Sequence, residues 1–186
     1  LIKLDQTILT FFNGSDSLYV DGLMLVLTNA LTWVPLYLAL VVVIIKNNET
    51  MPQILLAIGA AIVCVFITSL AADVLAKPYF ERWRPTNDPI IKYSIDVVNG
   101  FRESKFGFFS GHAANTMGIA TFVSLLFRSK MLSCLMVLWS LLNCYTRLYL
   151  GVHYPGDILV GLLCGASVGF IVYIIYNKVY VKISTN

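Results

Sequence analysis

The residues best suited to chemistry lie in one short stretch, 146–157, between two apolar segments. It contains a guanidinium at Arg147, an imidazole at His153 and a carboxylate at Asp157. Such groups are costly to bury in or near a membrane and are usually functional there. A proline–glycine pair favours a helix start just after His153, which puts Asp157 in the first helical turn. There its carboxylate can accept a hydrogen bond from one imidazole nitrogen and leave the other nitrogen free to act as a nucleophile.

The composition places this stretch in a membrane protein. Of 186 residues, 58% are hydrophobic and 12% are charged, with a mean hydropathy of +0.79, whereas soluble domains carry roughly 25% charged residues. The net charge of +3 is small and there is no long basic run, so we predict no nucleic-acid partner. The four cysteines all lie in apolar segments, so we predict no disulfide. They show no Cys-x-x-Cys spacing, so we predict no zinc site.

Apolar runs predict an all-α membrane bundle of about five transmembrane helices, in which Pro35 is expected to kink the first. The third and fourth runs are shorter than the ~20 residues that a crossing needs, so His112 and Arg147 at their ends should lie below the membrane surface. Glycines every four residues in the fifth run predict close helix packing, which we place inside the monomer in preference to a dimer interface. The predicted spans are residues 22–45, 52–76, 113–127, 131–146 and 158–176.

Two further segments complete the expected single domain, residues 1–186. Residues 2–12 have apolar side chains at near-helical spacing but are too short to span, so we interpret 1–21 as an interfacial helix and its connection. Residues 77–109 are the longest polar segment, and a loop of that length is usually functional. Asp73 lies four residues before Lys77, either as a structural ion pair or to position Lys77 for an anion.

Three motifs in this order resemble those of the type 2 phosphatidic acid phosphatase family, which shares its site with vanadium haloperoxidases. The first is a lysine, six residues and Arg-Pro, matched by Lys77 through Arg84-Pro85. The second, Pro-Ser-Gly-His, is present as Phe109-Ser110-Gly111-His112, with phenylalanine for proline. The third is Ser-Arg, five residues, His, three residues and Asp, and it is present as Thr146-Arg147 through His153 to Asp157, with threonine for serine.

The resemblance implies a catalytic role for three residues. The histidine at position 153 would attack phosphorus and form a phosphohistidine, while Asp157 holds and polarises it. His112 would protonate the leaving oxygen and then activate water for the second step.

Phosphate binding is expected from the cations and from a helix start. Arg84 and Arg147 offer bidentate forks and Lys77 offers a compact charge. Ser110 and Gly111 stand where the third helix begins, and free amide groups there favour an anion. We predict no metal and no cofactor, because these cations supply the charge stabilisation. Three other basic residues are interpreted as headgroup or loop contacts: Arg82, Arg102 and Lys105.

The predicted function is metal-independent hydrolysis of a phosphate monoester or diphosphate on an amphiphilic lipid. Undecaprenyl diphosphate, phosphatidylglycerol phosphate, phosphatidic acid and lipid A phosphates all remain open as substrates, and the oligomeric state is open as well. A lipid phosphotransferase is the alternative, since an alcohol can also resolve a phosphohistidine. The two histidines argue against a non-catalytic lipid-binding or transport protein.

The short connections opposite the site carry the basic residues that indicate membrane orientation. Only one acidic residue, Glu49, accompanies them. By the positive-inside rule that face is cytoplasmic, so we predict a bacterial inner-membrane protein whose site faces the periplasm or exterior. The basic residues are Lys46, Arg128, Lys130, Lys178 and Lys182.

Overall fold

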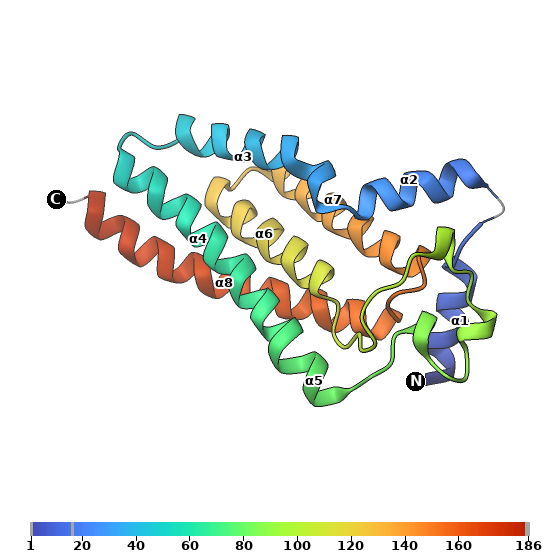
Figure 1. Ribbon diagram of the computed structural model, residues 1–186. Helices are drawn as coiled ribbons and strands as arrows, with labels where there is room; N and C mark the ends of the chain where they lie inside the picture. The colour runs from blue at the N-terminus through green and yellow to red at the C-terminus, as the bar shows by residue number, and fades with distance from the viewer. Residues whose placement is uncertain (1, 16, 185–186) are drawn as a thin grey trace.

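The computed structural model describes residues 2–15 and 17–184, and the bundle is built around helix α6 (Gly111–Phe127). This helix packs against α4, α7 and α8, and the side chains of Ala113, Ala120 and Phe122 are completely buried. Figure 1 shows α6 between these neighbours. The other α-helices of the described residues are α1 (Ile2–Phe12), α2 (Leu18–Thr28), α3 (Val34–Lys46), α4 (Met51–Ser69), α5 (Lys77–Phe80), α7 (Lys130–Tyr149) and α8 (Pro155–Ser184).

The apolar helices confirm the predicted all-α membrane bundle. Within the described residues, three helical segments are long and apolar enough to cross a membrane: Met51–Phe80, α7 and α8. The bent pair α2 and α3 would make a fourth if it forms one span. Helix α6 has 17 residues and therefore reaches only about 25 Å. It corresponds to the third predicted apolar run and packs among the longer helices. The chain is an integral membrane protein.

The first span bends at a different residue from the one predicted. The helices α2 and α3 meet at 71°, and the break lies at Asn29, not at Pro35. Pro35 instead occupies the first turn of α3, where the missing N–H leaves no helical bond unmade. The side chain of Asn29 accepts the N–H of Leu31 (3.0 Å), and the indole of Trp33 donates to the carbonyl of Leu27 (2.9 Å). These bonds satisfy backbone groups that the break leaves without helical partners.

The second span is longer than predicted. Helix α4 continues through a π-helical segment, Leu70–Ala76, directly into α5. Lys77 is therefore held on a helical turn and not in the polar loop, which we expected to start at residue 77. The chain leaves the helix at Glu81, which has a left-handed conformation with φ of 46°. The rigid end of this helix fixes where the ammonium group of Lys77 lies.

The close packing predicted for the glycines of α8 is confirmed inside the monomer. A Cβ added to Gly161 would lie 2.6 Å from the carbonyl oxygen of Ser110. Gly165 and Gly169 face the backbone of α6 in the same way. Without these glycines, α6 and α8 would have to separate, and the residues at the start of α6 would move with them.

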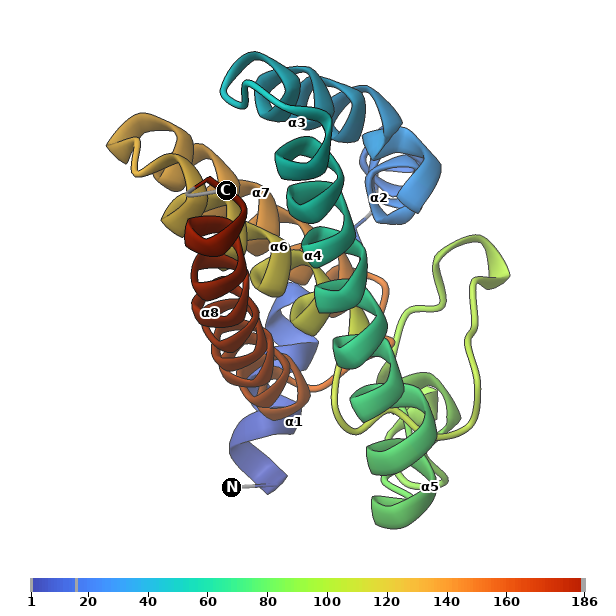
Figure 2. The ribbon, with the colours of Figure 1, turned by 90° about the vertical axis from the view of Figure 1, so that its left-hand side faces the viewer.

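The N-terminal helix and the polar loop lie at the same end of the bundle (Figure 2). Helix α1 forms as predicted, and its Leu9 is fully buried against Ile95 of the loop and Tyr154. The side chain of Asn13 donates to the carbonyls of Asp96 and Tyr149. Helix α1 therefore packs on the end of the bundle where the motif residues lie.

Candidate active site

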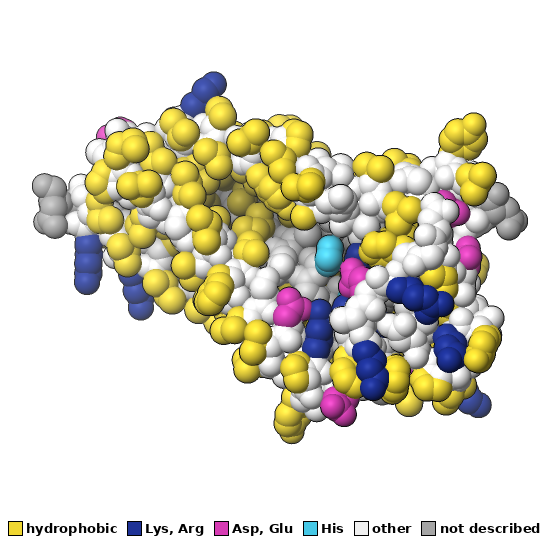
Figure 3. Space-filling model, in the orientation of Figure 1, with side chains coloured by type: hydrophobic (Ala, Val, Ile, Leu, Met, Phe, Trp, Pro, Cys, Tyr) yellow, Lys and Arg dark blue, Asp and Glu magenta, His cyan; other side chains and the backbone are white. Residues whose placement is uncertain are grey.

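Five separate segments line one pocket of about 340 Å³, which brings together the motif residues Lys77, Arg84, Gly111, His112 and His153. On the face seen in Figure 3, acidic and basic side chains gather around a histidine that is visible at the surface, whereas hydrophobic side chains cover the opposite end of the molecule. The pocket is lined by Asp73, Lys77, Arg84, Glu103, Ser104, Gly111, His112, Asn115 and His153.

Two buried guanidinium groups share the carboxylate of Glu103; Arg84 and Glu103 line the pocket, whereas Arg147 does not. Arg84 and Arg147 are 1% and 0% exposed. Nη2 of Arg84 lies 2.9 Å from one oxygen of Glu103, and Nη2 of Arg147 donates to the other oxygen. Buried charges need such partners, because desolvation is costly. Burial lowers the pKa of Arg84, and Glu103 opposes that shift. Burial also raises the pKa of Glu103, but Arg147 and Arg84 outweigh it and keep this carboxyl below its usual range.

The sequence analysis missed Glu103. It lies in a loop with several other acidic and basic residues, and no spacing rule separates it from them. Its pairing with two arginines, one from the loop and one from α7, depends on the tertiary structure alone.

His153 is 1% exposed and is held by Arg84. Its Nε2 lies 2.8 Å from Nη1 of Arg84, and because a guanidinium can only donate, Nε2 is the acceptor. The proton of the neutral ring is therefore on Nδ1. Burial, together with the positive charges of Arg84 and Arg147, lowers the pKa of His153 well below its usual value. The imidazole is thus neutral, with the lone pair of Nε2 directed at Arg84.

The predicted hydrogen bond between His153 and Asp157 is not formed. Nδ1 of His153 lies 3.6 Å from Oδ2 of Asp157, beyond hydrogen-bond distance, and it has no hydrogen-bond partner among the described residues. Helix α8 does begin at Pro155, with Asp157 in its first turn, as predicted. There Oδ2 accepts the backbone N–H of Tyr154 (3.1 Å), so a small shift of the imidazole is needed to complete the pair.

The sequence analysis interpreted Arg82 as a headgroup or loop contact, but its guanidinium instead pairs with carboxylates of two helices. Its Nη1 donates to Oδ1 of Asp157 and its Nη2 to Asp5 of α1, both at 2.6 Å. Although burial lowers the pKa of Arg82, these two carboxylates raise it above its usual value. Asp5 also accepts the backbone N–H of Gly156 (3.0 Å). The N-terminal helix therefore supports the carboxylate that faces His153.

The remaining predicted residues take different positions. Lys77 and Asp73 form an ion pair (2.5 Å) and both line the pocket, so the pair holds the lysine at the site. Gly111 and His112 also line it, but Ser110 does not. The hydroxyl of Ser110 instead caps α6 by accepting the N–H of Ala113 (3.4 Å).

Two loop cations behave as the sequence predicted. Arg102 donates to the carbonyl of Thr86, and the ammonium group of Lys105 lies 4.3 Å from the ring centre of Trp83. Both side chains therefore hold the loop together and do not line the pocket.

Residues 53–180 match the family model of the PAP2 superfamily. The membrane bundle with this polar pocket at one end defines a membrane phosphatase. The chain belongs to the PAP2 superfamily. It is a phosphoric ester hydrolase of the membrane lipid phosphatase type.

Two curated relatives cover nearly all of the chain. It is 37% identical to a lipid A 4'-phosphatase of Bacteroides thetaiotaomicron, over 100% of this chain and 83% of the relative. It is 31% identical to a lipid A 4'-phosphatase of Porphyromonas gingivalis, over 95% of this chain and 74% of that one.

The fold is shared with two solved structures. One is a transmembrane PAP2-type phosphatidylglycerolphosphate phosphatase from Bacillus subtilis, with a TM-score of 0.71 and 23% identity over 95% of this chain and 86% of that one. The other is LpxE of Aquifex aeolicus, with a TM-score of 0.67 and 22% identity over 91% of this chain and 94% of that one.

Proposed function

We propose that the chain removes a phosphate group from lipid A through a phosphohistidine formed on Nε2 of His153. In the first step Nε2 attacks phosphorus, the bond to the lipid oxygen breaks, and His112 gives that oxygen a proton. In the second step His112 takes a proton from water, whose oxygen attacks phosphorus and releases inorganic phosphate and the free imidazole. Asp157 stabilises the charge that develops on His153.

The observation that carries this proposal is the contact of Arg84 with both His153 and Glu103. The N–H groups that now reach Nε2 and a carboxylate have the geometry to hold phosphate oxygens beside the nucleophile. Arg147, Lys77 and the backbone at Gly111 would add donors for the developing charge. A phosphate would then take the place of the Glu103 carboxylate between the two guanidiniums.

The substrate is proposed from the relatives. Both lipid A 4'-phosphatases exceed 30% identity over 95% or more of this chain. This favours a phosphate monoester at the 4' position of lipid A over the other candidate lipids. We also propose that residues 1–186 act as one domain, because α1 supports Asp157 through Arg82.

The test is phosphate release by the purified protein in detergent, in excess EDTA, from four lipids compared at equal concentration. These are lipid A, undecaprenyl diphosphate, phosphatidylglycerol phosphate and phosphatidic acid. We expect the highest kcat/KM with lipid A and, by mass spectrometry, loss of the 4' phosphate. A higher kcat/KM with another lipid would contradict the substrate, and activity that returns only with added magnesium would contradict the metal-free mechanism.

We further propose that the protein lies in a bacterial inner membrane with its pocket facing outward. Support comes from the basic residues in the short connections at the end of the bundle opposite the site, including Lys46, Arg128 and Lys130. Lipid A presented on the outer leaflet would then reach the pocket directly.

A further inference from the structure

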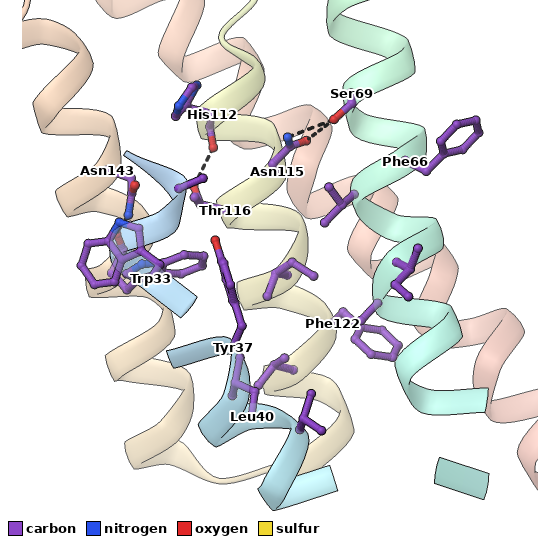
Figure 4. Close-up of a pocket in the computed structure, with 18 of the residues that line it drawn as sticks. Trp33, Tyr37, Leu40, Phe66, Ser69, His112, Asn115, Thr116, Phe122 and Asn143 are labelled. Carbon is purple, nitrogen blue, oxygen red and sulfur yellow. Dashed lines mark hydrogen bonds between the residues drawn. The ribbon is translucent and has the colours of Figure 1, made fainter. Parts of the chain in front are cut away.

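A second, larger cavity of about 760 Å³ adjoins the phosphate pocket inside the bundle. Figure 4 shows side chains from α3, α4, α6 and α7 pointing into it. His112 and Asn115 line both cavities, so the larger one begins where the phosphate pocket ends. The surface in Figure 3 is hollowed between hydrophobic side chains on this face.

The lining changes from polar to apolar with depth. Near the phosphate pocket it includes polar side chains, among them Ser69, Asn115 and Thr116, and Asn115 donates to Ser69 at 3.0 Å. Farther along α6 the wall becomes hydrophobic, with Phe122 and Val123. A polar ligand would lose its hydration there without gaining hydrogen bonds, whereas a hydrocarbon would not.

The cavity forms a groove lined by residues of α3, α4, α6 and α7. Helices α3 and α4 are joined by a short turn at residues 47–50 and diverge toward the other end, as Figure 1 shows. Along α6 the lining runs from His112 to Val123, which is about 16 Å at ~1.5 Å per residue. A hydrocarbon core of ~30 Å gives each leaflet roughly 15 Å. The groove is therefore about as deep as one leaflet.

We propose that this groove binds one hydrocarbon chain of the substrate lipid while its phosphate lies at Arg84 and His153. The inference rests on the proposed function, which it deepens by assigning a site for the lipid tail. The volume lies in the usual range for ligand pockets, about 300–1,000 Å³. Because the groove is continuous with the phosphate pocket, a lipid whose phosphate lies in that pocket can place its own chain in the groove. This favours the substrate over an unrelated lipid. The polar side chains at the end next to the phosphate pocket meet the linkage between chain and headgroup.

The first test fills the groove with a larger side chain and uses a matched control. Val65 lines the groove, whereas Val63, on the same helix, does not and is 47% exposed. We expect Val65→Phe to raise the KM for lipid A on the order of tenfold or more, because fewer methylenes can be buried. Hydrolysis of para-nitrophenyl phosphate, which has no chain, should stay within about twofold of wild type, and Val63→Phe should change neither substrate.

A second measurement fills the groove after folding. Val65→Cys and Val63→Cys are made with Cys134→Ser and Cys164→Ala, purified, and treated with an alkyl methanethiosulfonate. We expect the alkylated Val65→Cys protein to lose lipid A turnover at sub-saturating substrate and to keep para-nitrophenyl phosphate turnover. Reduction should restore the lipid activity.

An unchanged KM for lipid A in Val65→Phe, or equal effects at positions 63 and 65, would overturn the inference. If Val65→Phe loses both substrates because it misfolds, the alkylated Val65→Cys protein decides. Failure of the proposed function is separate, because it would appear as absence of lipid A hydrolysis in the wild-type protein.

Discussion

Arg84 donates from Nη1 to Nε2 of His153 across 2.8 Å, although 69 positions separate them in the chain. The lone pair that would attack phosphorus is therefore hydrogen-bonded to a cation that would bind the phosphate. Entry of a phosphate oxygen would draw this N–H away from Nε2 and free the nucleophile at the same time. In the proposed mechanism, binding of the phosphate and activation of the nucleophile would thus be coupled through one guanidinium.

Glu103 should weaken anion binding, because its carboxylate pairs with the two guanidiniums that a phosphate needs. We expect Glu103→Gln to lower the inhibition constant of orthovanadate about tenfold, or ~1.4 kcal/mol. The control is Glu81→Gln, since Glu81 is exposed and does not line the pocket. Weaker vanadate inhibition in Glu103→Gln would mean that Glu103 positions the arginines more than it competes with the anion.

Removing either histidine should separate the two chemical steps. His153→Ala should lower kcat on the order of 10⁴-fold or more, because the nucleophile is lost. His112→Ala should lower it about 10²–10⁴-fold and accumulate phosphorylated protein with para-nitrophenyl phosphate, whose leaving group needs little protonation. Both are measured by phosphate release and by mass spectrometry of the intact protein. Phosphoenzyme formation in His153→Ala would refute the assignment of the nucleophile.

Arg82 should act through Asp157, because it pairs with this carboxylate and with Asp5. We expect Arg82→Gln to lower kcat on the order of tenfold with little change in KM, since the carboxylate would lose its position. Asp5→Asn should have a smaller effect, and the double variant should be no worse than Arg82→Gln alone. As the control, Arg102→Gln should keep a normal kcat. Equal losses of kcat at both arginines would show only a general effect of the loop.

The pH profile should report the neutral imidazole of His153. Burial and nearby cations depress its pKa in the folded protein, so the reactive neutral form persists as the pH falls below ~6.5, the ordinary histidine value. We expect kcat/KM for para-nitrophenyl phosphate to decline only below that pH. Arg84→Gln removes a positive charge and should move the decline to higher pH. A wild-type decline centred at or above 6.5 would contradict a neutral resting His153.

The proposed orientation can be read from cysteine accessibility in intact cells. In a background without the four native cysteines, we expect an impermeant maleimide to label Ile90→Cys but not Asn47→Cys. Ile90 is 82% exposed in the loop beside the site, and Asn47 lies in the turn between α3 and α4. Labelling after permeabilisation controls for reactivity. The reverse pattern would place the pocket at the cytoplasmic leaflet.

Much of the fold could be predicted from the sequence because its signals are local. Long apolar runs predict membrane helices, since backbone groups in lipid must bond within their own helix. Pro155 and Gly156 predict the start of α8, because proline and glycine act on the backbone of neighbouring residues. The glycines of α8 predict a close neighbour, because a residue without a side chain lets another backbone approach the helix.

The tertiary structure decided which charged groups are partners. Glu103 holds Arg84 and Arg147, and Asp5 reaches Asp157 through Arg82, across separations that no local pattern encodes. The bend at Asn29 and the groove between α3 and α4 likewise depend on how whole helices pack. The residue types and their spacings were enough to predict phosphate-ester chemistry. The position of each charged group depends on burial and on pairing with residues far away in the chain, and both arise only once the helices have assembled.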